Sequence, residues 1–440
     1  MINRNIENNP LVQKFFEIDF FNLSKEAGFT LRQRKASADQ WLLSFFALSL
    51  QSQFSFSNWA IQLSLIIKDS ISKQGLWKRL NQAHRDFLES VLKKVISQQI
   101  DDFSSQNAIN KNLLFNKFGR VLIQDSTTIR LPVHFNKIFP GNRANGSLKS
   151  LLKIQAIINL KNHHFPLLEV NKYKENDQKF SSTSASVFQK GDLIIRDLGY
   201  FVLKNLSQIT QKGAFYISKL RYGVNIYDQE GSQIDLLKVV KNKSVWEQEV
   251  YLGKQKIKTR ITVFKVSEAT AEKRRRKAKN DRDKRLNHSK KYYQLLGYDI
   301  LISNVETEIL SAYQVKQAYA LRWRIETIFK TWKSHLNLQK RITDQMIDPE
   351  KILILIHYTL IFITVIQTNI FFHFWWRIYN KYNRHLSLTK FTQFIADNLI
   401  LTLFTNDPLL IEKILYQACT YETRKTRLNF SQKTLEFNLS

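Results

Sequence analysis

Two short apolar runs, each followed by an aspartate, constrain the fold of this chain more than any other feature. Residues 120–124 are rich in β-branched and apolar side chains and lead to Asp125, and residues 191–196 are similar and lead to Asp197. Runs of this length and composition predict short buried strands. We therefore expect two strands of an α/β sheet, each of which carries a carboxylate at its end.

A long amphipathic helix is predicted at residues 308–338. Tyr319, Arg322, Glu326 and Lys333 stand at offsets of 0, 3, 7 and 14 residues, which at about 100° per residue confines them to a sector of roughly 60°. A row of ionisable groups beside a buried stripe is where a partly desolvated site would lie. The apolar side chains fall on a different sector, where they can pack on a sheet: Leu321, Ile325, Ile328, Phe329 and Trp332.

These polar side chains have two interpretations. Arg322 and Glu326 alone would be an ordinary surface ion pair one turn apart, which contributes about 0.2–0.5 kcal/mol. Together with Asp125 and Asp197, however, Glu326 completes a set of three carboxylates, whose oxygen ligands suit hard cations such as Mg²⁺ or Mn²⁺. Two such ions can activate a water or a 3′-hydroxyl and stabilise the leaving oxygen of a phosphodiester.

The charge balance favours a polyanionic partner. Lys and Arg number 67 against 37 Asp and Glu, a formal charge of +30, which nucleic acid would neutralise; a solvated surface is the alternative. Cys419 is the only cysteine, which excludes an intramolecular disulfide and a thiolate zinc cluster and favours a reducing compartment. The first ten residues hold no apolar stretch, so we expect no secretory signal.

Four regions are expected along the chain. Residues 1–118 are predicted to be a helical N-terminal DNA-binding domain. Within it, residues 70–80 offer a serine at a helix start and a basic face, which suits either a recognition helix in a major groove or an ordinary surface helix. The other regions are a catalytic core at residues 119–205 and 296–376, a β-rich insertion at residues 206–295, and a C-terminal helical region at residues 377–440.

Within the insertion, residues 272–291 hold eleven Lys or Arg against three acids. This basic segment includes Arg274, Arg275 and Arg276, and it is predicted to be either a contact to the DNA backbone or a solvated linker.

An uncharged stretch at residues 352–376 is long enough to cross a bilayer. Because it contains His357, Gln367 and His373, which are costly in hydrocarbon, we expect a buried helix instead. Residues 151–160 and 165–170 predict a hairpin. Its turn holds His163 and His164, which we expect to be solvated rather than to bind a metal, because no third nitrogen or sulfur ligand lies nearby in sequence.

The spacing Tyr319-x2-Arg322-x3-Glu326-x6-Lys333 resembles the signature of the DDE transposases of bacterial insertion sequences, specifically the insertion-sequence-four family. Asp125 precedes it in the order that the family shows, as does the second aspartate, and the resemblance covers residues 120–340 firmly. It implies a ribonuclease H-like fold, which is a mixed sheet with flanking helices, in which the two strands ending in aspartates are adjacent.

For function, the resemblance implies a DNA transposase that cleaves transposon ends and joins them to target DNA as a synaptic homodimer. Asp125, Asp197 and Glu326 would hold two Mg²⁺ ions, for which Mn²⁺ can substitute. The partners would be the terminal inverted repeats and the target DNA, with no membrane, and the protein would be cytoplasmic in a bacterium and nucleoid-associated when bound to DNA. An inactive or domesticated transposase that only binds DNA is the alternative.

The resemblance also implies contacts to DNA. Tyr319, Arg322 and Lys333, together with Lys330, would contact phosphates near the cut, which suits their chemistry. Tyr298 lies where hairpin-forming relatives carry a tryptophan that stacks a base flipped from the duplex. Tyrosine offers less stacking area, so hairpin formation is left open, and packing in the core is the alternative role for Tyr298.

Overall fold

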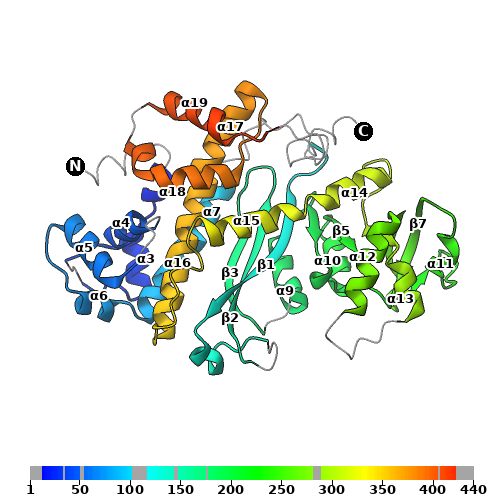
Figure 1. Ribbon diagram of the computed structural model, residues 1–440, viewed down its shortest axis with the longest axis horizontal. Coiled ribbons are helices and arrows are strands. Elements are labelled where there is room, and N and C mark those ends of the chain that lie inside the picture. The colour runs from blue at the N-terminus through cyan, green and yellow to red at the C-terminus, as the bar shows by residue number, and fades with distance from the viewer. Residues whose placement is uncertain are drawn as a thin grey trace. The chain divides into compact units, whose positions relative to one another are not determined.

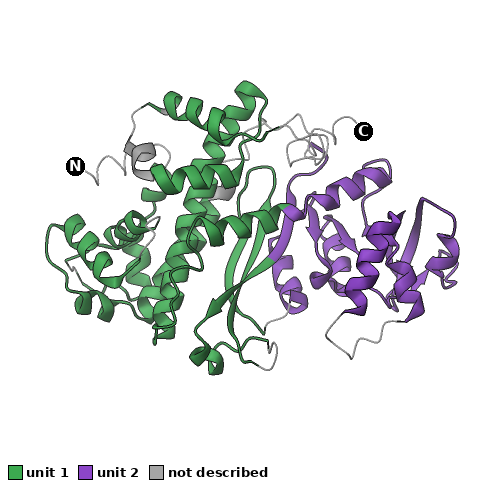
Figure 2. Cartoon of the chain, in the orientation of Figure 1, with its two compact units in different colours: residues 1–108, 126–174, 324–432 green, residues 109–125, 175–323, 433–440 purple. Residues whose placement is uncertain are grey.

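The computed structural model describes residues 12–32, 35–49, 54–101, 116–142, 147–174, 177–280, 289–404 and 407–422. Figure 1 shows the helices and strands. The chain divides into two compact units, which Figure 2 shows in different colours. Unit 1 comprises residues 1–108, 126–174 and 324–432, and unit 2 comprises residues 109–125, 175–323 and 433–440. The domain boundaries expected from sequence remain a prediction.

The N-terminal part of unit 1 is helical, as its apolar periodicity predicts. Across residues 12–32, 35–49 and 54–101 there is no strand. The predicted serine start of one helix is confirmed, because the Ser72 hydroxyl accepts a hydrogen bond from the Gly75 amide at 3.0 Å. The helices are α2 (Gln13–Phe16), α3 (Phe20–Glu26), α4 (Ala38–Leu48), α5 (Phe56–Ile67), α6 (Lys73–Arg79) and α7 (Gln82–Asp101).

The uncharged stretch forms a buried helical column in unit 1, as predicted. It runs through α16 (Pro349–Val365), a π-helical turn at Ile366–Phe371, and α17 (Phe372–Tyr382). By length and composition this column could span a membrane, but 89% of its most apolar window is buried inside the protein. Tyr358 of α16 shows how the column is held: its ring stacks on Phe45 at 4.5 Å, and its hydroxyl lies 2.7 Å from the His84 ring nitrogen.

Unit 1 also contains the predicted hairpin, formed by β2 (Ser150–Asn159) and β3 (Leu167–Lys172), which pair antiparallel. The prediction of a solvated histidine turn is wrong. His163 and His164 are 1% and 3% exposed, and the His163 ring meets Phe371 edge-on at 5.2 Å. Burial among aromatic rings holds the pKa of His163 well below its usual value, so this ring is neutral.

The strands form one nine-stranded mixed sheet in the order β3-β2-β1-β4-β5-β9-β8-β7-β6, which confirms a mixed α/β fold. The strands β1 (Val121–Leu131), β4 (Leu193–Arg196) and β5 (Phe215–Lys219) are parallel neighbours, and they belong to unit 2 except for residues 126–131 of β1. The strands β9 (Tyr298–Ser303), β8 (Ile257–Lys265), β7 (Val245–Leu252) and β6 (Ile226–Tyr227) then continue the sheet in antiparallel pairs. The β-rich segment therefore extends the sheet that carries the aspartates.

Short helices accompany the strands of unit 2. They are α9 (Asp177–Thr183), α10 (Leu203–Gln211), α11 (Leu236–Val239), α12 (Glu268–Lys279), α13 (Lys290–Leu295) and α14 (Ala312–Ala320), with 3-10 turns at Ser184–Val187 and Leu198–Tyr200. The basic segment falls on α12 and α13, and its residues 281–288 lie outside the described residues.

Two predicted element boundaries are wrong. The first strand does not end at Asp125, because β1 continues to Leu131. The long helix predicted at residues 308–338 is two helices, α14 and α15 (Trp323–Ser334). Between them, the amides of Leu321 and Arg322 donate to carbonyls three residues earlier, each at 3.1 Å, which tightens the chain from α-helical to 3-10 geometry.

The C-terminal region of unit 1 is helical as far as it is described, as predicted. It contains α18 (Leu388–Phe404) and α19 (Pro408–Cys419). The remainder of the predicted region, residues 423–440, lies outside the described residues.

Candidate active site

The register of the parallel strands in unit 2 places the two predicted aspartates side by side. The last paired residues of β1 and β4 are Gln124 and Arg196. Asp125 is the next residue of β1, and Asp197 directly follows β4 with an extended backbone. The two aspartates therefore occupy adjacent positions at a separation close to the strand spacing of about 4.8 Å. The prediction that the two aspartate-bearing strands are neighbours is confirmed.

A buried arginine joins the two carboxylates. Arg322, whose side chain is 7% exposed, places Nη1 3.5 Å from Asp125 Oδ2 and Nε 3.8 Å from Asp197 Oδ1. The aspartates keep access to solvent, with 19% of the Asp125 side chain and 45% of the Asp197 side chain exposed. One guanidinium therefore offsets the mutual repulsion of two neighbouring negative charges.

Tyr319 completes this group from the last turn of α14. Its hydroxyl donates a hydrogen bond to Asp197 Oδ1 at 3.4 Å. Burial raises the pKa of Tyr319 well above its usual value, and the negative charge of Asp197 raises it further, although Arg322 acts in the opposite direction. The phenol therefore stays protonated and acts as a donor.

The other members of the predicted signature lie on α15 in unit 1. Glu326 is half-buried in the first turn of α15, Lys330 is exposed, and Lys333 is half-buried in the last turn. Burial lowers the pKa of Lys333, and the charge of Arg130 lowers it further. The helix break at residues 321–322 means that the common 60° sector predicted for Tyr319, Arg322, Glu326 and Lys333 does not apply.

The chemistry of the aspartate pair suits a hard cation. Both donors are carboxylate oxygens that face one positive group and remain partly exposed, and such oxygens are the ligands that Mg²⁺ and Mn²⁺ prefer. Within the described ranges, no three His, Cys, Asp or Glu side chains lie together in an arrangement that could hold a metal ion. A complete metal site would require a further ligand besides the two aspartates.

Sequence reasoning missed the polar cluster on the opposite face of the aspartate strands. Arg196, which precedes Asp197, is 1% exposed, and its Nη1 donates to Ser181 Oγ at 2.7 Å. Gln124, which precedes Asp125, donates to Ser184 Oγ at 2.9 Å. Burial lowers the pKa of Arg196 to about 9. Both aspartate strands are thus hydrogen-bonded to one short segment, and only the run of serines at residues 181–186 could have hinted at it.

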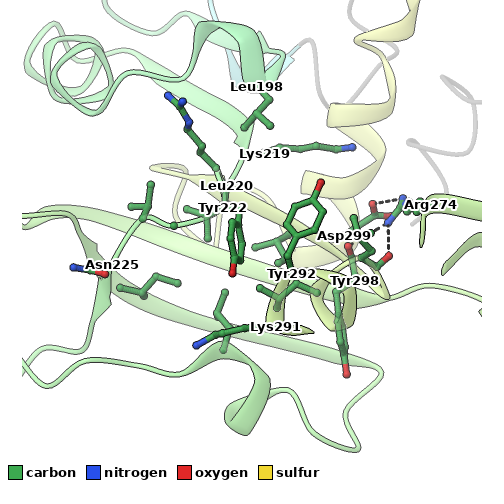
Figure 3. Close-up of a pocket in the computed structure, with 18 of the residues that line it drawn as sticks. Leu198, Lys219, Leu220, Tyr222, Asn225, Arg274, Lys291, Tyr292, Tyr298 and Asp299 are labelled. Atoms are coloured by element: carbon green, nitrogen blue, oxygen red, sulfur yellow. Dashed lines mark hydrogen bonds and ion pairs between the residues drawn. The ribbon is translucent and has the colours of Figure 1, made fainter. Parts of the chain in front are cut away.

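Tyr298 lies at the start of β9, half-buried, on the wall of a pocket of about 700 Å³ in unit 2. Two further tyrosines line the same pocket (Figure 3): Tyr222 and Tyr292, whose rings meet edge-on at 5.0 Å. Leu198, the residue after Asp197, is also part of its lining. The pocket therefore combines aromatic faces with a position close in sequence to the aspartate pair.

The three predicted arginine contacts differ in their surroundings. Arg274 forms an ion pair with Asp299 at 2.7 Å and donates to the Tyr298 carbonyl at 3.2 Å (Figure 3). Arg275 forms an ion pair with Glu268 at 2.5 Å. Arg276 is exposed. Two of the three arginines therefore have structural partners in unit 2.

Comparison with known proteins gives concordant results. The model of the transposase DDE domain family matches residues 116–360, which is more than half of the chain. The transposase for insertion sequence element IS231B from Bacillus thuringiensis subsp. berliner is 32% identical over 335 residues, covering 71% of this chain and 69% of that protein. The transposase for element IS231C from the same organism is 28% identical over 425 residues, covering 91% and 84%.

A relative from another genus is the transposase for element IS1151 of Clostridium perfringens, which is 27% identical over 347 residues and covers 73% of this chain and 72% of that protein. Among solved structures, the piggyBac transposase synaptic complex with hairpin DNA aligns with 96% of this chain and 87% of that chain, at a TM-score of 0.48 and 10% identity. A TM-score of this size does not establish a shared fold. The family model and the 32% identity do establish the family, and the chain is a DDE transposase related to those of IS231-type insertion sequences.

Proposed function

We propose that this transposase cleaves DNA at the ends of its own insertion sequence and joins those ends to target DNA, using Asp125, Asp197 and Glu326 to hold two divalent metal ions. The observation that carries the proposal is the convergence of Asp125 and Asp197 on Arg322. Two carboxylates at adjacent positions of neighbouring strands are the arrangement that a bridging cation requires.

Mg²⁺ is the proposed ion, with Mn²⁺ as a substitute, because the donors are carboxylate oxygens. When bound, the ions would activate a water or a 3′-hydroxyl and stabilise the leaving oxygen. The chain itself contributes orientation. Arg322 holds the two aspartates together, and the Tyr319 hydroxyl fixes one Asp197 oxygen.

DNA is the proposed partner, as terminal inverted repeats and as target. Tyr319, Arg322, Lys330 and Lys333 are proposed to contact phosphates near the cut, since cations and hydroxyls bind phosphate oxygens. Helix α6, with its serine cap and its basic residues in the last turn, is proposed to contribute to binding by the N-terminal helices. A cytoplasmic homodimer that bridges two ends is the proposed working assembly.

The parallel pairing of β1 with β4 and of β4 with β5 supports a ribonuclease H-like core. In such a core neighbouring parallel strands bring acidic side chains together, as the register of β1 and β4 brings Asp125 and Asp197 together here.

Hairpin formation at the transposon end is proposed to use Tyr298. Its pocket contains two more tyrosines, and aromatic rings stack on unpaired bases at about 1–3 kcal/mol per base. Tyr298→Ala should slow end-hairpin formation and spare the first nick. Equal loss of both steps, measured on end-labelled DNA in a denaturing gel, would count against this role.

The proposed chemistry is tested with four variants on two DNA substrates, a labelled end and a pre-cut end. Asp125→Asn, Asp197→Asn and Glu326→Gln should each abolish cleavage of a labelled end and joining of a pre-cut end in Mg²⁺, while salt-sensitive DNA binding persists. Glu308→Gln, at an exposed acid in unit 2, is the matched control and should retain activity. Cleavage by one of the three carboxylate variants would remove that residue from the site. Joining by all three variants would refute the proposal.

A further inference from the structure

The strand beside β4 ends in a lysine at the level of the two aspartates. The paired residues of β4 and β5 end at Ile195 with Ile217. Continuing this register by two residues, to the residue just after β4, brings Asp197 level with Lys219. Asp125 is level with Asp197 by the register of β1 and β4. Side chains at one level of adjacent parallel strands point to the same face. The three residues therefore form a row that crosses β1 in its middle, passes just beyond the end of β4 and reaches the last residue of β5.

The side-chain position of Lys219 agrees with this row. Its Nζ lies 5.8 Å from the centre of the Tyr319 ring, and the hydroxyl of that ring donates to Asp197. Lys219 also lines the tyrosine pocket together with Leu198 (Figure 3). Lys219 thus lies near the phenol that contacts Asp197 and also lines the pocket.

The charge of Lys219 is available to a ligand. Arg322 already faces both aspartates. Two of the other cations that line the pocket have acidic partners, because Arg274 pairs with Asp299 and Lys291 pairs with Asp235. Across the described residues, the one interaction found for the Lys219 ammonium is with the Tyr319 ring, a contact worth only about 0.5–1 kcal/mol at such sites.

We propose that Lys219 binds a phosphate of the DNA strand being cut, next to the scissile phosphate on the side that leads into the tyrosine pocket. The inference rests on the proposed function. A phosphodiester brought to two carboxylates is repelled by them, and a lysine in the same row offsets that repulsion at the neighbouring phosphate. Lys219 is therefore a substrate-positioning residue of the strand-cleavage site.

The test combines Lys219→Ala with DNA in which one phosphate at a time is replaced by an uncharged methylphosphonate. Affinity for a pre-cut end and the rate of end cleavage are both measured. Loss of a charge-assisted hydrogen bond should weaken binding or cleavage about 10- to 100-fold. At the contacted phosphate, the methylphosphonate should lower the affinity or cleavage rate of wild type by a similar factor. It should change those of Lys219→Ala little, because the two changes remove the same contact. Lys219→Arg should restore most of the loss.

Lys243→Ala, at an exposed lysine in the turn before β7, is the matched control and should show full sensitivity at every phosphate. The proposal would be overturned if the effects of Lys219→Ala and of the methylphosphonate were additive at every phosphate. It would also be overturned if Lys219→Ala were as sensitive to each methylphosphonate as Lys243→Ala. The affinity measurement needs no catalysis, so a phosphate-specific result would stand even if wild type failed to cleave. Failure to cleave or join would instead count against the proposed function.

Discussion

Replacing Asp125 with asparagine should cost stability as well as activity. At 3.5 Å from Arg322 Nη1, a unit charge pair is worth about 5 kcal/mol at an effective dielectric constant of about 20. Part of this is recovered, because the Asp125 side chain is 19% exposed, Asp197 remains near the guanidinium, and the asparagine oxygen can still accept a hydrogen bond. We therefore expect the free energy of unfolding to fall by about 1–2 kcal/mol.

Asp197→Asn should be milder. Its nearest approach to Arg322 is 3.8 Å, and its side chain is 45% exposed, so water screens the pair and the loss should stay below about 1 kcal/mol. Both variants should be inactive. A difference between their free energies of unfolding would therefore report the strengths of the two ion pairs rather than the loss of catalysis.

Hydrogen exchange of the β4 amides in increasing urea would measure the stability of this part of unit 2. Arg322→Met, alone and combined with each asparagine variant, completes two double-mutant cycles. A coupling energy near zero for Asp125 and Arg322, or a larger loss for Asp197→Asn than for Asp125→Asn, would refute the electrostatic argument.

Three other predictions concern separate parts of the chain. Burial lowers the pKa of His84 to about 3, whereas the same group in the unfolded chain binds a proton below about pH 6.5. The free energy of unfolding should therefore fall as the pH drops from 6.5 toward 3, by about 2 kcal/mol at pH 5. In urea unfolding His84→Gln should show a shallower pH dependence than wild type, and an equal dependence would contradict this. Tyr319→Phe removes one long hydrogen bond and should slow cleavage by less than about tenfold in single-turnover assays. A larger decrease in the cleavage rate would point to a direct role in the reaction. Arg274→Ala breaks an ion pair and should lower the melting temperature. Arg276→Ala, at an exposed position, should leave the melting temperature unchanged and reduce the salt dependence of DNA binding. The opposite pattern would exchange the roles of the two arginines.

Local patterns predicted much of this fold. The apolar runs before Asp125 and Asp197 predicted two strands, and the structure makes them parallel neighbours. The hairpin and the N-terminal helices also follow their periodicity, since each pattern reports which face of one element is buried.

The wrong predictions concern places where contacts between residues far apart in the sequence determine the local structure. No glycine or proline marks the helix break at residues 321–322, where the guanidinium of Arg322 lies between aspartates far away in sequence. The polar turn at His163 is buried by Phe371, more than 200 residues later. Lys219 and Arg196 carried no signal of their own, because their significance comes from strand register, which a single sequence does not display.

The parallel pairing that sets the aspartates side by side joins Val121 to Leu193, 72 residues further along the chain. Closing so long a loop is entropically costly and slow compared with forming a hairpin. A polypeptide still being synthesised cannot complete this pairing until β4 has left the ribosome. Premature termination before Leu193 would thus release fragments that keep the N-terminal helices but lack the strand pairing that brings Asp125 and Asp197 together.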